Sequence, residues 1–438
     1  MHQRVAPEWR VAAAAVILAN ALFVVIQLSV AHSPREVLIR KIKNAFVSGE
    51  LIDKDVLPLD THRGYNQYND CLILQLITNR TGSGVADAFG PVWYLRQEEQ
   101  PDVCSSLHQL TDRDGDTRGL IQQRYTRYWH GYNAVAALLL QHFELIDVRR
   151  ILKTAFCIVF VAVGVAPLGN MRLTVVALPI AIFGLAFWQI GEFGQSLSHA
   201  PGEMSVFIGL FCLLVWRKHL ISPAVYVPWF AAFGAVLAYL DMFTGPTPMA
   251  FGLLIPVFAL IQITSGPAHG SCNAKDLWRT IAVAAAALFA GEFITVVTKQ
   301  ALAMSFVSAA SAGSFTSRLG LYMGFPGVMN GEYVPPFVGG IRLVLREGAS
   351  LTHESVRGAR LLFAVSVVAW IAAAASAYLS RHRPALNEFA VFLAGAVVPL
   401  AWMVVLQNHT AHHSELMVRL LLVPIALGWG ALGWQLLR

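Results

Sequence analysis

The run VAAAAVILANALFVVIQLSV, residues 11–30, decides the fold class. It contains no charged residue, and a helix needs about 20 mostly apolar residues to cross the hydrocarbon core of a bilayer. A basic start, MHQRVAPEWR, precedes it, as in a signal peptide. The run is longer than a signal core, however, and no small-residue cleavage motif follows it before Pro34. We therefore interpret residues 11–31 as the first membrane span.

Similar apolar runs recur along the whole chain. Of its 438 residues, 56% are hydrophobic and only 13% are charged, which excludes a water-soluble domain of this length. The runs are continuously apolar rather than alternating, so they predict helices and not barrel strands. Nine further spans are expected at about 151–168, 173–190, 203–216, 222–241, 248–265, 280–298, 360–378, 388–406 and 417–434. The prediction is an all-α polytopic membrane protein with about ten transmembrane helices.

Basic residues in the short loops predict the orientation. They fall on one side of the predicted spans, which the positive-inside rule assigns to the cytoplasm. They are Arg4, Arg10, Arg172, Arg217, Lys218, Lys275, Arg279, Arg381, Arg383 and Arg438. We expect a multi-pass protein of a bacterial inner membrane with both termini in the cytoplasm. Because these loops hold much of the +6 net charge, we expect membrane lipids, and no nucleic acid, as partners.

The same orientation divides the chain into five parts. Residues 1–31 form the cytoplasmic N-terminus and first span, and residues 151–298 form a transmembrane core. Residues 32–150 and 299–359 are two large periplasmic loops, and residues 360–438 hold the C-terminal transmembrane helices. The chemistry is therefore expected on the periplasmic face.

Both large loops have predicted features of their own. Residues 34–50 are amphipathic and predict a helix lying on the membrane surface, and residues 132–147 predict an interfacial or re-entrant helix. The second loop carries Lys299, Arg318 and Tyr322 among Gly and Pro and is expected to act as a lid.

Two of the five cysteines, Cys71 and Cys104, fall in the first periplasmic loop, where oxidation is permitted. We predict a disulfide between them. The alternative is two separate buried thiols.

The stretch LDTHRGYNQYNDCLILQL, residues 59–76, crowds polar side chains before an apolar helix. Asp60 or Asp70 suits a general base that activates a hydroxyl, and Tyr65, Asn66 and Tyr68 suit a surface on which a sugar stacks. The alternative is a polar turn that caps the helix beginning near Asn69.

A second stretch, QQRYTRYWHGY at residues 122–132, holds Arg127 and His130 among aromatic residues. It suits a polyprenyl phosphate arriving from the bilayer, although an aromatic belt at the membrane boundary is the alternative.

A third stretch, QNHTAHHSELMVRLLLVP at residues 407–424, holds His409, His413 and Arg419. A cation at the membrane edge is expensive, which favours a functional role over a structural ion pair. Zinc bound by three histidines is a competing idea, but no matching ligand spacing occurs elsewhere. No metal ligand is therefore assigned.

Polar residues at span ends are candidates for the lining of a polar cavity, because each is costly at membrane depth. They are Glu192, His199, Glu203 and Asp241.

With these residues placed, the chain resembles the GT-C superfamily of integral-membrane glycosyltransferases, which use polyprenyl-phosphate sugar donors. The likeness lies in the architecture: a first span, a large outer loop with an acidic residue, a core of spans and a second outer loop. The motifs NDCLILQ, RYWHGY and NHTAHHSELMVR also resemble motifs of an uncharacterised bacterial branch of multi-pass proteins.

The resemblance implies roles for these residues. Asp70 is preferred to Asp60 as the base, although GT-C proteins often carry the acid closer to the first span, which leaves the choice between the two open. Five Arg and His side chains would bind the donor phosphate: Arg127, His130, His409, His413 and Arg419. The implied reaction is an inverting transfer of a sugar, such as arabinofuranose, to a glycan, lipid or protein acceptor of the cell envelope.

No cofactor follows from the resemblance, and a divalent cation is compatible with it. Two other functions remain open. A lipid-linked oligosaccharide polymerase or ligase would share the outer cations but need no carboxylate base. A lipid or solute transporter would place charged residues near the bilayer midplane and break its helices in paired halves.

Overall fold

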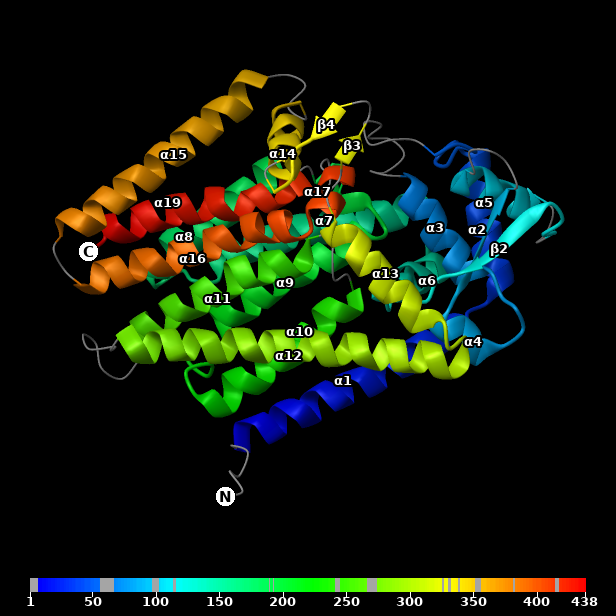
Figure 1. The fold of residues 1–438 in the computed structure, drawn as a ribbon, viewed down its shortest axis with the longest axis horizontal. Helices are drawn as coiled ribbons and strands as arrows, with labels where there is room; N and C mark the ends of the chain where they lie inside the picture. Colours follow the sequence, from blue (N-terminus) through cyan, green and yellow to red (C-terminus); the bar gives the residue numbers. More distant parts are fainter. Residues whose placement is uncertain are drawn as a thin grey trace.

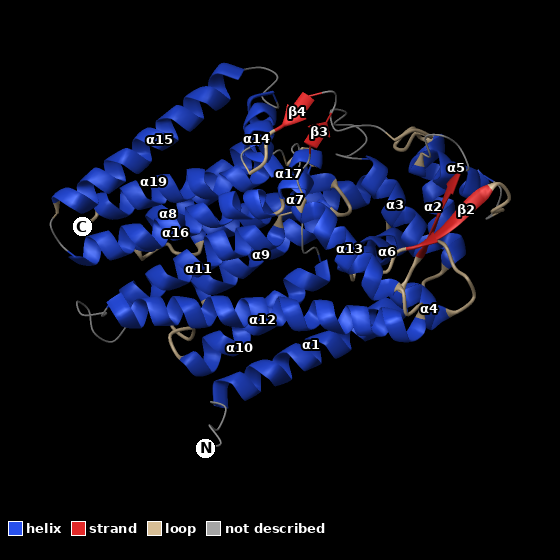
Figure 2. Cartoon of the chain, in the orientation of Figure 1, coloured by secondary structure: helices blue, strands red, loops and turns tan. Residues whose placement is uncertain are grey.

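The computed structural model describes residues 7–55, 67–96, 102–112, 116–188, 190–191, 193–240, 245–265, 274–324, 327–329, 332–337, 339–350, 356–380, 383–413 and 417–438. Helices dominate this part of the chain, and the strands in it form two short antiparallel pairs (Figure 2).

Long helices run along the long axis of the molecule and form its main body (Figure 1). Each overlaps one of the segments predicted to span the membrane. They are α1 (Pro7–Ala31), α7 (Leu145–Val165), α8 (Met171–Phe187), α9 (His199–Val215), α10 (Pro223–Leu240), α11 (Pro246–Ser265), α12 (Ala274–Phe306), α15 (Val356–Leu379), α16 (Arg383–Val405) and α19 (Leu422–Leu436).

Among the described residues, 6 helices are long and apolar enough to cross a membrane. They are Pro7–Ala31, Pro223–Leu240, Pro246–Ser265, Ala274–Phe306, Ala385–Val405 and Val418–Leu436. Shorter apolar helices lie at Met171–Ala186, His199–Val215 and Ala364–Leu379. The chain is thus an all-α multi-pass membrane protein, as predicted.

Helix α1 shows the polarity expected of a helix in lipid. Its apolar Ile17 and Leu18 are 67% and 72% exposed, whereas its polar Asn20 and Gln27 are buried against other helices. Asn20 donates a hydrogen bond of 2.9 Å to the Thr295 hydroxyl of α12. A water-soluble helix would bury the apolar side chains and expose the amides.

Between α1 and α7 lies a group of short elements at one end of the long helices, which we call the head (Figure 1). In chain order it contains α2 (Arg35–Val47), α3 (Gln67–Thr78), α4 (Gly84–Phe89), β1 (Val92–Arg96), α5 (Val103–Asp112), β2 (Leu120–Arg124) and α6 (Gly131–His142). Strand β1 pairs with β2 in antiparallel register, Val92 opposite Arg124.

In the head, the prediction for residues 34–50 is wrong and the predicted disulfide is confirmed. Helix α2 does bury one apolar face, but Leu38 and Ile42 lie against protein, because α2 packs on α3, α5 and α6 rather than offering that face to lipid. A disulfide joins Cys71 of α3 to Cys104 of α5, which is the predicted pairing.

The boundary between the head and the long helices also differs from prediction. Residues 132–147 divide into α6 and the first turn of α7, because α7 begins at Leu145 instead of about 151. This earlier start adds Arg149, which is 1% exposed, to a long helix.

The expected lid is largely helical. Lys299 belongs to α12, which continues to Phe306, so this residue lies in a long helix and not in a loop. The following elements are α13 (Ser311–Met323), β3 (Gly327–Met329), β4 (Glu332–Val334) and α14 (Gly339–Ser350). Short helical segments connect other long helices: η1 (Phe193–Gln195), α17 (Gln407–His412) and η2 (Val418–Leu421). Both α13 and α14 pack on α17.

Helices α10 and α12 approach each other backbone to backbone. A Cβ at Gly234 would collide with the Leu288 carbonyl, and a Cβ at Gly291 would collide with the Ala231 carbonyl. Small residues allow such close packing of spans where no hydrophobic effect drives association.

Candidate functional site

The site begins at the first turn of α3, where Asp70 is completely buried. Arg149 of α7 donates from Nη2 to Asp70 Oδ2 at 2.8 Å, and the backbone N–H of Leu197 donates to Asp70 Oδ1 at 3.0 Å. Burial raises the pKa of Asp70, and the Arg149 charge opposes that rise. The expectation of an accessible general base is therefore not met in this conformation, since both carboxylate oxygens already bind protein groups.

Residues 193–203, which follow α8, contact both α3 and η2. Asn69 Nδ2 lies 3.4 Å from Nε2 of His199, whose Nδ1 is buried and has no hydrogen-bond partner among the described residues. Four residues on, Glu203 forms a buried ion pair with Arg419. The Arg419 guanidinium also lies 3.7 Å from the centre of the Phe193 ring. Two buried ion pairs, from Arg149 and Arg419, thus flank residues 193–203.

The loop between β2 and α6 supplies the second motif. His130 has a left-handed backbone with φ of 55°, which is uncommon for a residue other than glycine, and Gly131 follows it. Its Nδ1 bonds to the Tyr132 hydroxyl, and its ring lies 4.2 Å from that of Tyr125. The Arg127 guanidinium lies 5.4 Å from the centre of the Tyr125 ring.

Helix α17 brings the third motif to the second. The Tyr128 hydroxyl donates to the Tyr322 hydroxyl of α13 at 3.3 Å. The Tyr322 ring in turn lies 4.4 Å from that of His409, and His409 lies 4.7 Å from His413 between ring centres. A continuous row of rings therefore joins the loop, α13 and α17.

Amide side chains at the start of α17 hold α13 in place. Asn408 Nδ2 donates to the Leu321 carbonyl at 2.7 Å, and Gln407 Nε2 donates to the Met323 carbonyl at 3.3 Å. These carbonyls are in the last turn of α13, where intrahelical donors run out. The two residues before His409 thus bind the end of α13, the helix that carries Arg318 and Tyr322.

Two arginines place positive charge close to these rings. Arg318 lies 5.8 Å from the Tyr322 ring centre, and both Arg127 and Arg318 act electrostatically on Tyr68. Burial, followed by His412 and Arg318, lowers the pKa of His413 to about 4. His413 is therefore neutral at pH 7, so the positive charge beside these rings comes from Arg127 and Arg318.

Three motifs far apart in sequence thus meet at the head end of the long helices. We call this set the three-motif cluster; it comprises Tyr68, Asn69, Asp70, Tyr125, Arg127, Tyr128, His130, His409 and His413, with His199, Tyr322 and Arg318 beside them. Arg419 acts electrostatically on His199 and thus lies at its edge. Other predicted site residues lie outside the described residues: Asp60, Tyr65, Asn66, Glu192 and Asp241.

The sequence analysis misses some contributors to the site. It does not place Arg149 there, and it assigns Arg318 and Tyr322 only to a lid. One signal for Arg149 was available: Arg149 and Arg150 precede a span on the side predicted to be periplasmic, where basic residues are unusual.

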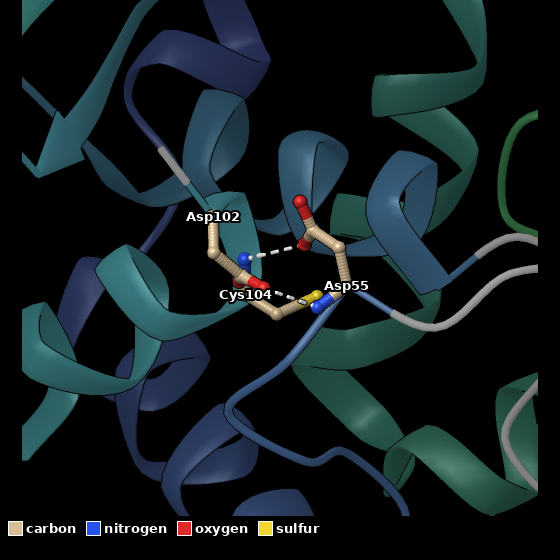
Figure 3. Close-up of side chains that lie close together, drawn as sticks. All are labelled: Asp55, Asp102 and Cys104. Carbon is tan, nitrogen blue, oxygen red and sulfur yellow. Dashed lines mark hydrogen bonds between the residues drawn. The ribbon is translucent and has the colours of Figure 1, made fainter. Parts of the chain in front are cut away.

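Asp55, Asp102 and Cys104 are the one group with metal-ligand spacing among the described residues (Figure 3). Cys104 is in a disulfide and offers no thiolate. Asp55 accepts from the N–H groups of Val103 and Cys104, each at 3.0 Å, and Asp102 accepts from that of Ser105 at 2.7 Å. The carboxylates therefore cap α5 rather than form a metal site.

Comparison with known proteins found no match to any family model, curated protein or solved structure.

Proposed function

We propose that this chain is a glycosyltransferase of the bacterial inner membrane that moves a sugar from a polyprenyl-phosphate donor to an acceptor on the periplasmic face. The single observation that carries the proposal is the three-motif cluster. Motifs selected from the sequence for sugar and phosphate chemistry meet in space, although more than 300 residues separate Asp70 from His409.

The proposed topology has ten spans with both termini in the cytoplasm. Its support is the arrangement of the ends: the start of α1 and the end of α19 lie at the end of the long helices opposite the head (Figure 1). Arg172, Arg217, Lys218 and Lys275 flank connections between long helices at that end. This distribution fits a cytoplasmic far end and a periplasmic head.

The residue chemistry of the cluster suits a lipid-linked sugar phosphate. Arg127 and Arg318 offer charge to phosphate oxygens, and neutral imidazoles of His409 and His413 can donate hydrogen bonds or accept protons. Tyr68 and Tyr322 offer aromatic faces to a sugar ring. The donor's prenyl chain would remain in the bilayer beside the long helices.

The proposed reaction is one displacement. The acceptor hydroxyl oxygen bonds to the anomeric carbon, the bond from that carbon to the phosphate oxygen breaks, and the hydroxyl proton passes to a carboxylate. Polyprenyl phosphate leaves with the bonding electrons, stabilised by the cations. Asp60 or Asp70 is the proposed base, and Asp70 can serve only after Arg149 leaves its carboxylate.

The test is transfer of label by purified protein in lipid nanodiscs, using radiolabelled polyprenyl-phosphate sugars, arabinofuranose among them, and membrane extract as acceptor. D60N and D70N are compared with D147N, which alters an exposed carboxylate of α7. We expect one of the first two to lose transfer by at least about a hundredfold, and D147N to retain it.

Two results would contradict the proposal. Transfer from a diphosphate-linked oligosaccharide that survives both D60N and D70N would indicate a polymerase or ligase. Movement of a lipid or solute across sealed vesicles without any transfer would indicate a transporter.

A further inference from the structure

The loop that carries Arg127 and His130 is held by polar side chains from two long helices. Gln300 of α12 donates to the Arg127 carbonyl at 2.8 Å, and Gln27 of α1 donates to the Trp129 carbonyl at 3.1 Å. The Trp129 indole N–H in turn donates to the Thr295 carbonyl at 2.8 Å. The long helices therefore fix the backbone of the loop directly.

Lys299 lies in the middle of these contacts and is 1% exposed. Its Nζ donates to the Phe89 carbonyl, at the end of α4, and lies 5.8 Å from the centre of the Trp129 ring. No carboxylate pairs with it in the part of the chain that the structure describes. A buried ammonium held by one carbonyl and aromatic rings is expensive, and its cost calls for a role beyond packing.

His130 is the neighbour on which Lys299 acts. Its left-handed backbone is followed by Gly131, where a Cβ would collide with Tyr239 of α10. Other groups facing the His130 ring are Tyr125, Tyr128 and Tyr132 of its own segment. The charges of Lys299 and Arg127 add to burial in lowering the pKa of His130.

We propose that Lys299 is a positioning residue for the donor site, fixing Trp129 and the strained His130 through its contacts with Phe89 and the Trp129 ring. This inference rests on the proposed function, because it assigns Lys299 to the same site. One helix, α12, then holds the loop through Lys299 and Gln300 and leads directly into α13, which carries Arg318.

The test compares K299R, K299M and K299Q with K153M, a change at an exposed lysine of α7. Glutamine keeps a donor for the Phe89 carbonyl and removes the charge, so K299Q serves if K299M fails to fold. The first readout is the pH titration of the His130 ring, followed by NMR of isotope-labelled histidine in nanodiscs. It needs no transfer activity, so it stays informative if the proposed function fails.

We expect the His130 titration to move to higher pH in K299M and K299Q and to stay unchanged in K299R and K153M. In the transfer assay, K299M should lose kcat/KM by about tenfold or more, with K299R recovering part of it. An unchanged His130 titration in K299Q, or transfer by K299M equal to that of K153M, would overturn the inference and leave Lys299 as a structural core residue.

Discussion

The pairing of Asp70 with Arg149 removes two charges from solvent at the start of α3. Breaking a buried pair from one side leaves an uncompensated charge, which typically costs about 3–5 kcal/mol. R149M should therefore lower the thermal stability of the protein in detergent by about this amount, and the double variant R149M with D70N should recover much of it. A double-mutant cycle measured by thermal unfolding checks this. Additive losses would show that the two side chains do not interact.

Asp55 gives the head a pH-dependent stability. Burial raises the pKa of Asp55 from its ordinary value of 3.8 to about 6, and Asp102 adds to the rise. The folded protein therefore binds more protons than the unfolded chain between these values, so the contribution of Asp55 to stability falls as pH rises from about 4 through about 6. Urea unfolding followed across this range should show the fall in wild type and a smaller one in D55N. An identical pH dependence in D55N would contradict the assignment.

At the residue scale, the sequence predicted reactive groups better than their partners. Asp70, His130 and His409 stand out because they are polar residues beside apolar runs. Their partners Arg149, Lys299 and Tyr322 do not, because only tertiary contacts across 79 or more residues bring each pair together. Burial of Asp70 could not be predicted either, since an N-terminal turn is exposed unless another element covers it.

The crossing of α10 and α12 depends on Gly234 and Gly291, each of which faces the backbone of the other helix. G291V should separate the helices and cost about 3 kcal/mol or more, because a backbone carbonyl cannot move aside as a side chain can. G313A, in α13, has nothing within 4 Å of the added Cβ and serves as the control. The yield and thermal unfolding of both variants in detergent check this. Wild-type stability in G291V would contradict the described crossing.

Among the elements, apolar runs predicted the long helices well, and amphipathic stretches less well. Periodicity shows that α2 has an apolar face but not whether lipid or protein covers it, and α3, α5 and α6 cover it here. The expected loop at residues 299–359 begins with two more turns of α12, since helix formation does not stop where hydrophobicity does.

For the whole molecule, the proposed topology predicts which loops an impermeant reagent reaches. In a background without Cys157, Cys212 and Cys272, a cysteine at Ser48 of the head should react with an impermeant maleimide in intact spheroplasts. A cysteine at Lys218 should react only after permeabilisation. Both positions are exposed in the structure, so accessibility to water does not confound the result. The reverse pattern would invert the sidedness.

The central claim is that one lipid-linked phosphate binds where three distant motifs meet. Photolabelling with a polyprenyl phosphate that carries a photoreactive group next to its phosphate tests it most directly, with labelled peptides identified by mass spectrometry. The account predicts label in residues 125–132, 318–323 and 407–413 together, and competition by unlabelled polyprenyl phosphate. Label confined to the far ends of the long helices, or spread along them without competition, would contradict it.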